Sequence, residues 1–254
     1  MLVATPPDFT LHLRSWTEAP AGSGRWEAME RAVEIPGNRL ALLLCDVWDH
    51  HWCRGAEARC AVLAERMARV VEAVRRKGVQ IIHAPSDCMA FYAGTPQRAM
   101  MANLTILDPP PARAMPDPPL PIDDSDMGCD DDPPCDREPP DWPPWTRQHA
   151  AIRIVDGDAI SADGAEVFSL LKSRGIDRLL IMGVHTNMCV LNRSFAIKQM
   201  TRWYVDCALV RDLTDTMYNH RMRPFVTHDE GTALVVEHIE RHWCPTLLSR
   251  DLVA

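Results

Sequence analysis

The chain lacks an excess of basic residues. Its 254 residues carry a formal net charge of −8, and lysine occurs only at positions 77, 172 and 198. Nucleic acids and anionic membrane surfaces bind proteins through clustered positive charge. The composition therefore predicts neither kind of partner and favours a small-molecule substrate.

Long apolar runs are missing as well. No stretch approaches the roughly 20 apolar residues of a membrane span, and residues 1–21 have no apolar core of signal-peptide length. Nine cysteines, an odd number, leave at least one free thiol and disfavour a fully disulfide-stapled exterior protein. These features predict a cytoplasmic protein.

The length and the hydrophobic periodicity both favour an α/β fold. A chain of 254 residues with 46% hydrophobic content can build one large core. Short apolar runs alternate with helical patterns, which is typical of βαβ units around a parallel sheet. We expect a single domain over residues 1–254, a three-layer α/β/α sandwich with a mostly parallel, doubly wound, Rossmann-like sheet. The expected strands are 40–45, 79–84, 178–183 and 205–210, and the expected helices are 57–77, 165–174 and 232–242, with another after residue 189.

A cysteine stands where a predicted strand passes into a predicted helix. The sequence Gly-Val-His-Thr-Asn-Met-Cys-Val over 183–190 places Cys189 at the helix start. Backbone N–H groups at such a start carry positive partial charge, which lowers a thiol pKa and binds an oxyanion. Most cysteines are merely small buried hydrophobes, but the position of Cys189 indicates a nucleophile.

An aspartate ends another apolar strand in a similar way. Residues 40–45 are continuously apolar, and Asp46 follows them directly. Ligands of open parallel sheets bind outside the carboxyl ends of the strands. If the two strands are neighbours, Asp46 and Cys189 share a pocket and form an acid/base pair.

The order of these elements resembles the isochorismatase-like cysteine hydrolases, a superfamily that includes nicotinamidase and N-carbamoylsarcosine amidase. The resemblance covers residues 38–248, with one interruption. It implies that Asp46 is the general base and Cys189 the nucleophile, that a lysine completes the triad, and that a cis peptide joins Val184 to His185.

The chain departs from that family in its cation. None of the three lysines lies in the strand where the resemblance places the catalytic one, near residues 152–154. Arg153 is the nearest cationic candidate and Arg147 is the alternative, and a solvated surface role is equally compatible with either. Arginine keeps its proton, so it can hold a carboxylate ionised but cannot shuttle protons.

Residues 105–146 interrupt the α/β pattern. They hold 13 of the 21 prolines, together with a dense aspartate cluster over 123–132, and therefore form neither a helix nor a central strand. The alternatives are a lid, an oligomer contact and a flexible arm. Trp142 and Trp145 favour packing against a surface, so we predict an arm that closes over the pocket or over a neighbouring subunit of a homo-oligomer.

The cysteine and histidine spacings predict no metal site and no cofactor. Cys129 and Cys135 are six residues apart, which differs from zinc-knuckle spacing and suggests a local disulfide or two free thiols. The histidine with which nicotinamidases bind metal after the second strand is missing. Asp49 and His51 have a metal-like spacing in another place, and a role in the pocket wall is the preferred reading.

The sequence thus predicts a metal-independent cysteine hydrolase that acts on a small amide through a thioester. The alternatives are a degraded binding or scaffold protein on the same fold and a vinyl-ether hydrolase of the isochorismatase kind, which Cys189 disfavours. The predicted catalytic residues are Asp46, Cys189 and Arg153, and the predicted substrate-binding residues, which include the oxyanion donors, are Trp48, Trp52, His149, His185 and Thr186.

Overall fold

Strand β3 (Leu40–Cys45) runs through the centre of the molecule, and all six of its residues are buried. Its side chains alternate between two cores: Ala41, Leu43 and Cys45 face one, and Leu40, Leu42 and Leu44 face the other. A strand buried on both faces reads as a continuous apolar run, because helices cover it on each side. The computed structural model describes residues 8–136 and 142–253.

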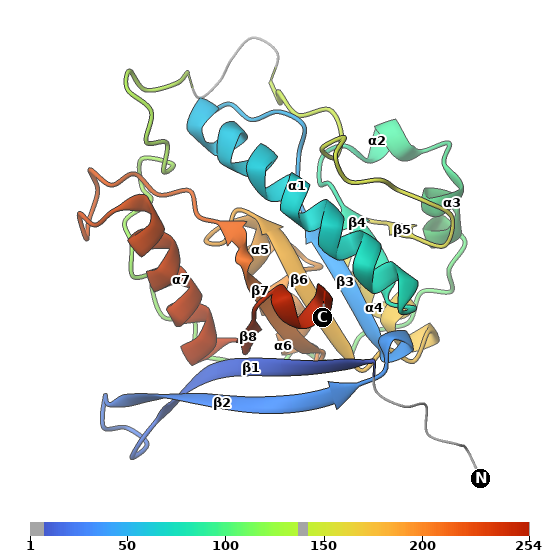
Figure 1. Ribbon diagram of the computed structural model, residues 1–254, viewed down its shortest axis with the longest axis horizontal. Helices are drawn as coiled ribbons and strands as arrows, with labels where there is room; N and C mark the ends of the chain where they lie inside the picture. The colour runs from blue at the N-terminus through green and yellow to red at the C-terminus, as the bar shows by residue number, and fades with distance from the viewer. Residues whose placement is uncertain (1–7, 137–141, 254) are drawn as a thin grey trace.

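Eight strands form one sheet around β3 (Figure 1). The neighbours of β3 are β4 and β6, and all three are parallel. Strands β5, β7 and β8 extend this parallel arrangement, whereas β1 is antiparallel to both β2 and β8. Across the sheet the order is β2 (Trp26–Ile35), β1 (Phe9–Glu18), β8 (Thr246–Leu247), β7 (Asp206–Asp215), β6 (Arg178–Val184), β3, β4 (Gln80–Ala84) and β5 (Ala159–Ile160).

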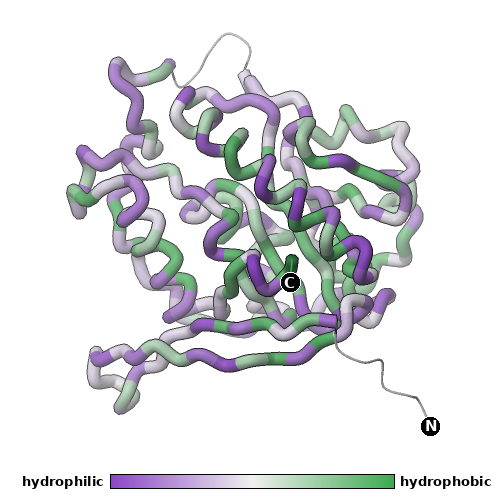
Figure 2. Tube along the Cα trace, viewed as in Figure 1, coloured by the Kyte–Doolittle hydropathy of each residue, from purple (hydrophilic) through white to green (hydrophobic). Residues whose placement is uncertain are grey.

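Helices cover both faces of this sheet. The long helix α1 (Arg54–Arg76) and the short α8 (Arg250–Val253) contribute to one core. The other core takes residues from α3 (Pro96–Ala102), α4 (Gly164–Ser173), α5 (Cys189–Asn192), α6 (Ile197–Arg202) and α7 (His228–His242). The remaining short helices are η1 (Gly37–Arg39) and α2 (Met89–Tyr92). Figure 2 shows apolar central strands beneath a largely polar α1, and the predicted three-layer α/β/α sandwich is confirmed.

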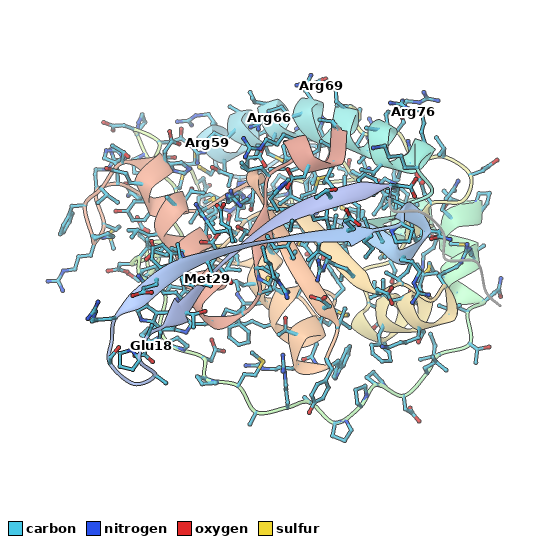
Figure 3. The ribbon with its side chains drawn as sticks, turned by 60° about the horizontal axis from the view of Figure 1, so that its bottom comes forward. Glu18, Met29, Arg59, Arg66, Arg69 and Arg76 are labelled. Carbon is cyan, nitrogen blue, oxygen red and sulfur yellow. The ribbon has the colours of Figure 1, made fainter. Side chains whose placement is uncertain are left out.

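Helix α1 illustrates how the sequence pattern produces this layering. Its apolar residues recur every three or four positions, so Leu63, Met67, Val70 and Val74 face the core. Three of its arginines, Arg66, Arg69 and Arg76, line the outer edge of the helix (Figure 3). No helix in the described parts of the chain is both long and apolar enough to cross a membrane.

The hairpin of β1 and β2 is a feature that the sequence analysis missed. Phe9, Leu11 and Leu13 alternate with exposed residues, and only this face of β1 reaches the core. Strand β2 is exposed along most of its length, with Met29 on its surface (Figure 3). The turn between the strands contains Gly22 and Gly24 at positive φ. Alternating apolar residues next to a glycine-containing turn are a sequence signal for a β-hairpin.

The described part of the proline-rich interruption, residues 105–136, is here called the strap. It contains no helix or strand, as its prolines predicted, and it packs against the α/β sandwich of the same chain. The backbone N–H of Arg113 donates to the Arg202 carbonyl at 3.0 Å. Asp117 pairs with Lys198 at 2.8 Å and Asp130 pairs with Arg59 at 3.1 Å. The strap is thus fastened to the sandwich by ion pairs; its contact with a second subunit stays a prediction, and residues 137–141 lie outside the described range.

Gly183, near the end of β6, allows β3 and β6 to approach unusually closely. It has a φ of 128°, and a Cβ built on it would lie 2.0 Å from the Cys45 carbonyl oxygen. Any other residue would therefore push β6 away from the backbone that precedes Asp46. This close approach holds together the two strand ends that carry Asp46 and Cys189.

We expect Gly183→Ala to destabilise the protein by about 3 kcal/mol or more, because both the φ and the space exclude a side chain. Chemical denaturation compared with Gly94→Ala provides the measurement. Nothing lies within 4 Å of a Cβ at Gly94, so that control should stay within about 0.5 kcal/mol of wild type. Equal stability of the two variants would contradict the steric argument.

Candidate active site

Asp46 and Cys189 meet at the carboxyl edge of the sheet. The strands that carry them, β3 and β6, are direct neighbours, with Cys45 opposite Gly183 in register. Asp46 is fully buried and adopts a φ of 50°, and Cys189 is the first residue of α5. The Cys189 thiol lies beside the Asp46 carboxylate, close enough for each group to shift the pKa of the other. The sequence therefore predicted this pairing correctly in space.

Two groups from distant segments donate hydrogen bonds to the Asp46 carboxylate. Its Oδ1 accepts the backbone N–H of Ser86 at 2.7 Å, from the loop after β4. Its Oδ2 accepts the Arg193 Nε–H at 3.0 Å. Burial raises the pKa of Asp46, and the positive charge of Arg193 and these hydrogen bonds oppose that rise. Because its pKa is raised, Asp46 binds a proton more tightly than an exposed aspartate does.

The cation beside Asp46 is Arg193, which the sequence analysis did not consider. Arg193 also contacts Asp87 at 3.1 Å, and although burial alone would lower its pKa, the charge of Asp46 raises it. The available signal was spacing, because residues four apart at a helix start lie on one face and Arg193 is four residues after Cys189. From the sequence alone, however, an arginine at this position would be assigned to the exposed surface of a helix.

The predicted cations lie elsewhere. The Arg153 side chain is exposed and borders an open depression beside α1, with Glu72 and Arg76. Arg147 is exposed, lies 3.8 Å from Asp49 and covers the Phe91 ring. The prediction that either arginine pairs with Asp46 is wrong, since sequence order alone could not show that the residue after α5, Arg193, supplies the cation.

The expected lowering of the Cys189 pKa is also wrong for the substrate-free protein. Burial raises the pKa of this thiol, and the negative charge of Asp46 raises it further, while Arg193 acts in the opposite direction. The helix that begins at Cys189 is a single turn of four residues, too short for a strong macrodipole. At rest Cys189 is therefore a neutral thiol beside the Asp46 carboxylate.

The backbone around the motif leaves a restricted set of oxyanion donors. The Val184–His185 peptide bond is cis, as the family resemblance implies. The N–H of Thr186 donates to the Asp215 carbonyl at 2.8 Å, and its hydroxyl contacts that of Thr214 at 2.7 Å. Thr186 is therefore engaged in the fold, and its expected role as a donor to substrate is not available in this geometry.

The predicted aromatic wall is partly assembled. Trp48 is buried, donates its indole N–H to the Ser86 carbonyl at 3.1 Å and stacks on Trp145 at 4.2 Å. Trp48 and Cys189 belong to one apolar cluster. Trp52 packs instead against a second cluster, around Cys53 and Cys129. Trp48 therefore lies near the nucleophile and Trp52 does not, and substrate binding by Trp48 stays a prediction.

His185 is buried and His51 is half-buried, and both are neutral groups. Burial lowers the pKa of His185 to about 3 and that of His51 to about 4, and their rings meet edge to face at 5.0 Å. His185 shares a small cavity with Asp46 and Trp48. The Nδ1 atom of His149 accepts the N–H of Ala151 at 3.3 Å, so this ring is tied to its own loop.

Asp49 and His51, which have a metal-like spacing, are committed to other partners. Asp49 accepts from the N–H and the hydroxyl of Thr146 at 2.8 and 2.6 Å. The Nδ1 atom of His51 accepts the Cys53 N–H at 3.1 Å. The Asp49 bonds anchor the segment that follows Trp145, and the His51 bond fixes the turn before α1, so both side chains have a structural use.

An open cleft of about 470 Å³ reaches Cys189 from outside. Its walls combine the motif and the helix that follows it with two residues of the strap, and they consist of Leu120, Asp124, Asn187, Met188, Cys189, Asn192, Arg193 and Lys198. The volume suits a small molecule. The strap therefore lines the approach to the nucleophile within its own chain, as the lid alternative predicted.

Comparison with known proteins identifies the fold. No protein-family model and no curated protein matches the chain. Among solved structures, the chain is similar to a cysteine hydrolase from Pseudomonas syringae pv. phaseolicola 1448A at 14% identity and a TM-score of 0.51, covering 86% of this chain and 92% of that one. A structure described as an isochorismatase from Pseudomonas putida KT2440 matches at 13% identity and a TM-score of 0.49, with 84% and 90% covered. The chain has the isochorismatase-like fold.

We expect Asp46→Asn to lower the pH at which Cys189 becomes reactive towards iodoacetamide, because the negative charge that raises the thiol pKa is removed. Alkylation rates measured against pH, with Cys189 followed by peptide mass spectrometry, report the shift. Asp87→Asn is the control, since Asp87 contacts Arg193 and is half-exposed. An unchanged or higher midpoint in Asp46→Asn would argue against the Asp46–thiol coupling.

Proposed function

We propose that this protein is a cysteine hydrolase that cleaves a small amide through a thioester intermediate. The observation that carries the proposal is the Cys189 thiol beside the buried Asp46 carboxylate, with Arg193 hydrogen-bonded to that carboxylate, at the end of an open cleft. The isochorismatase-like fold agrees with it, because the P. syringae structure of similar fold is described as a cysteine hydrolase.

The first step forms a bond between the Cys189 sulfur and the substrate carbonyl carbon. Because the thiol is neutral at rest, its proton passes to Asp46 as the bond forms. Asp46 then returns that proton to the leaving nitrogen, the carbon–nitrogen bond breaks and an amine or ammonia departs. The raised pKa of Asp46 suits both halves of this transfer.

The developing oxyanion needs N–H donors that the fold has not already used. Met188 and Val190 both donate to the His185 carbonyl, and Thr186 donates to Asp215. The proposal therefore assigns the oxyanion to the backbone N–H groups of Cys189 and His185. Water afterwards attacks the thioester carbon, gives a proton to Asp46, and the acid leaves as the thiol is restored.

Arg193 acts through Asp46. An arginine stays charged at any working pH, so it favours the carboxylate form of the base and offsets the cost of burying that charge. Nucleophile, base and cation are all side chains of this chain, so the proposed chemistry needs no metal and no cofactor. The substrate is a small molecule that fits the cleft; a cytoplasmic location and a homo-oligomer stay predictions.

Cys189→Ala, Cys189→Ser and Asp46→Asn should each abolish turnover and leave the fold intact, because each change is small and lies at the edge of the sheet outside the central strands. Ammonia release from a panel of small amides, alongside circular dichroism, measures both properties. A wild-type protein that hydrolyses some amide, and a Cys189→Ala variant equally active on it, would rule out the thioester route. Inactivity of the wild type on every amide and ester would favour the scaffold alternative.

Arg193→Met should reduce kcat/KM by at least about tenfold. It should also move the acidic limb of the pH profile to higher pH, because loss of the positive charge raises the pKa of Asp46 further. Arg193→Lys should restore the limb towards wild type, whereas a purely structural role would give the same limb in both variants. Arg153→Met and Arg147→Met are matched controls, and we expect each to leave the rate within about twofold of wild type.

A further inference from the structure

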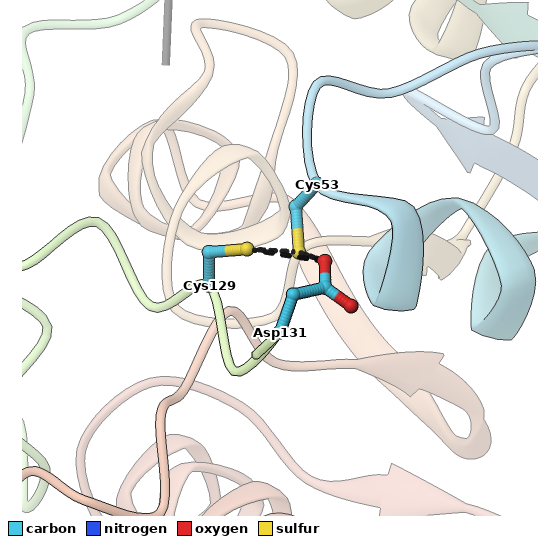
Figure 4. A group of neighbouring side chains, drawn as sticks. All are labelled: Cys53, Cys129 and Asp131. Atoms are coloured by element: carbon cyan, nitrogen blue, oxygen red, sulfur yellow. Dashed lines mark hydrogen bonds between the residues drawn. The ribbon is translucent and has the colours of Figure 1, made fainter. Parts of the chain in front are cut away.

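Three cysteines and an aspartate converge between the start of α1 and the strap, away from the cleft. Cys53 is the residue before α1, and Cys129, Asp131 and Cys135 belong to the strap. Cys53 and Cys129 are buried, with 0% and 8% of their surfaces exposed. Figure 4 shows the Cys53 and Cys129 sulfurs and the Asp131 carboxylate directed at one another.

All three cysteine sulfurs contact the same carboxylate oxygen. Asp131 Oδ2 lies 3.3 Å from the Cys53 sulfur, 3.4 Å from that of Cys129 and 2.9 Å from that of Cys135. The same oxygen also accepts the N–H of Gly55 at 3.1 Å. A carboxylate oxygen has about two lone pairs, so four donors exceed what it can accept.

We propose that Cys53, Cys129, Cys135 and Asp131 form a structural zinc site. Zinc prefers four ligands in a tetrahedron and takes thiolate sulfur together with carboxylate oxygen. Binding replaces the three thiol protons, which leave to solvent, by one divalent ion. The crowding at Asp131 Oδ2 is thereby relieved, because each donor atom then faces the ion.

Cys53, Cys129 and Asp131 already lie within 4.8 Å of one another, and Cys135 reaches the group through Asp131, so small side-chain movements complete a site for this ion. Bonds of about 2.3 Å to sulfur and about 2.0 Å to oxygen place those atoms roughly 3.5 Å apart in a tetrahedron. The two buried sulfurs, at 3.3 and 3.4 Å from Oδ2, are close to that value. The Cys53 and Cys129 sulfurs are 2.6 Å apart and must separate by about 1 Å, which rotation of the side chains provides.

A Cys53–Cys129 disulfide is the competing state, and the surroundings favour the ion. A disulfide bond would use two sulfurs and leave Cys135 and Asp131 without a role. The neighbouring donors suit an anionic cluster: the Arg54 N–H points to the Cys135 sulfur at 3.5 Å and the Gly55 N–H points to Asp131, both at the positive end of a 23-residue helix. Arg221 adds positive charge, donating to the carbonyls of Asp130 and Asp131.

The site would fix the strap to α1. Asp131 and Cys129 follow Leu120 and Asp124, the strap residues that line the cleft. The three strap ligands are bridged to Cys53 across 76 or more residues of sequence, so the ion closes a long loop. This assignment departs from the sequence-based prediction that the chain holds no metal, because the Cys129–Cys135 spacing alone omits Cys53.

Metal content tests the proposal directly. The full chain, expressed with zinc in the medium and purified with a reductant and without chelating resin, should hold about one zinc per chain by elemental mass spectrometry. Cys129→Ser, Cys135→Ser and Asp131→Asn should each lower zinc affinity by about tenfold or more. Cys60→Ser is the matched control, because Cys60 lies in α1 outside the cluster and its sulfur contacts only the Trp48 carbonyl at 3.9 Å.

Cobalt gives a second readout that does not depend on variant yield. Cobalt-loaded wild type should show sulfur-to-cobalt charge-transfer absorption that weakens in Cys135→Ser and is unchanged in Cys60→Ser. The proposal is overturned if the reduced protein binds neither ion, if the cysteine variants retain full zinc, or if peptide mapping finds a Cys53–Cys129 disulfide in metal-free protein. None of these results depends on hydrolase activity.

Discussion

The buried charge of Asp46 is the constraint on which the site depends. An ionised carboxylate with no exposed surface costs several kcal/mol unless partners surround it, and here the partners come from two segments that are far from Asp46 in the sequence. Ser86 follows β4, Arg193 follows α5 and Cys189 begins α5. The three strands β3, β4 and β6 must therefore be in register before the base can be charged.

Gly183 makes that register possible. Because β6 passes so close to the Cys45 carbonyl, the two strand ends bring the thiol and the carboxylate next to each other. The apolar pattern of β3, alternating between two cores, resists any shift of the strand by one residue. The packing that fixes the strand register thus also fixes the positions of the catalytic groups.

The strap explains the unusual composition of residues 105–136. Its prolines prevent helix and sheet pairing, so the segment remains extended and can follow the surface. Its aspartates compensate charges on the sandwich, as with Asp117 beside Lys198 and Asp130 beside Arg59. A segment that appears in the sequence as an acidic interruption is therefore part of the wall of the cleft.

The sequence by itself determined the α/β layering, because the spacing of apolar residues in β3 and α1 shows which faces are buried. It also indicated Asp46 and Cys189 as functional residues, because Asp46 directly follows a strand and Cys189 stands where a strand passes into a helix. It also contained the alternation of β1, which was overlooked. Only the tertiary structure decided the cation, because Arg193 reads as helix surface until β3 places Asp46 beside it. The same holds for Cys53 and Cys129, which are 76 residues apart: contacts between distant segments depend on how the chain closes, and no local pattern encodes them.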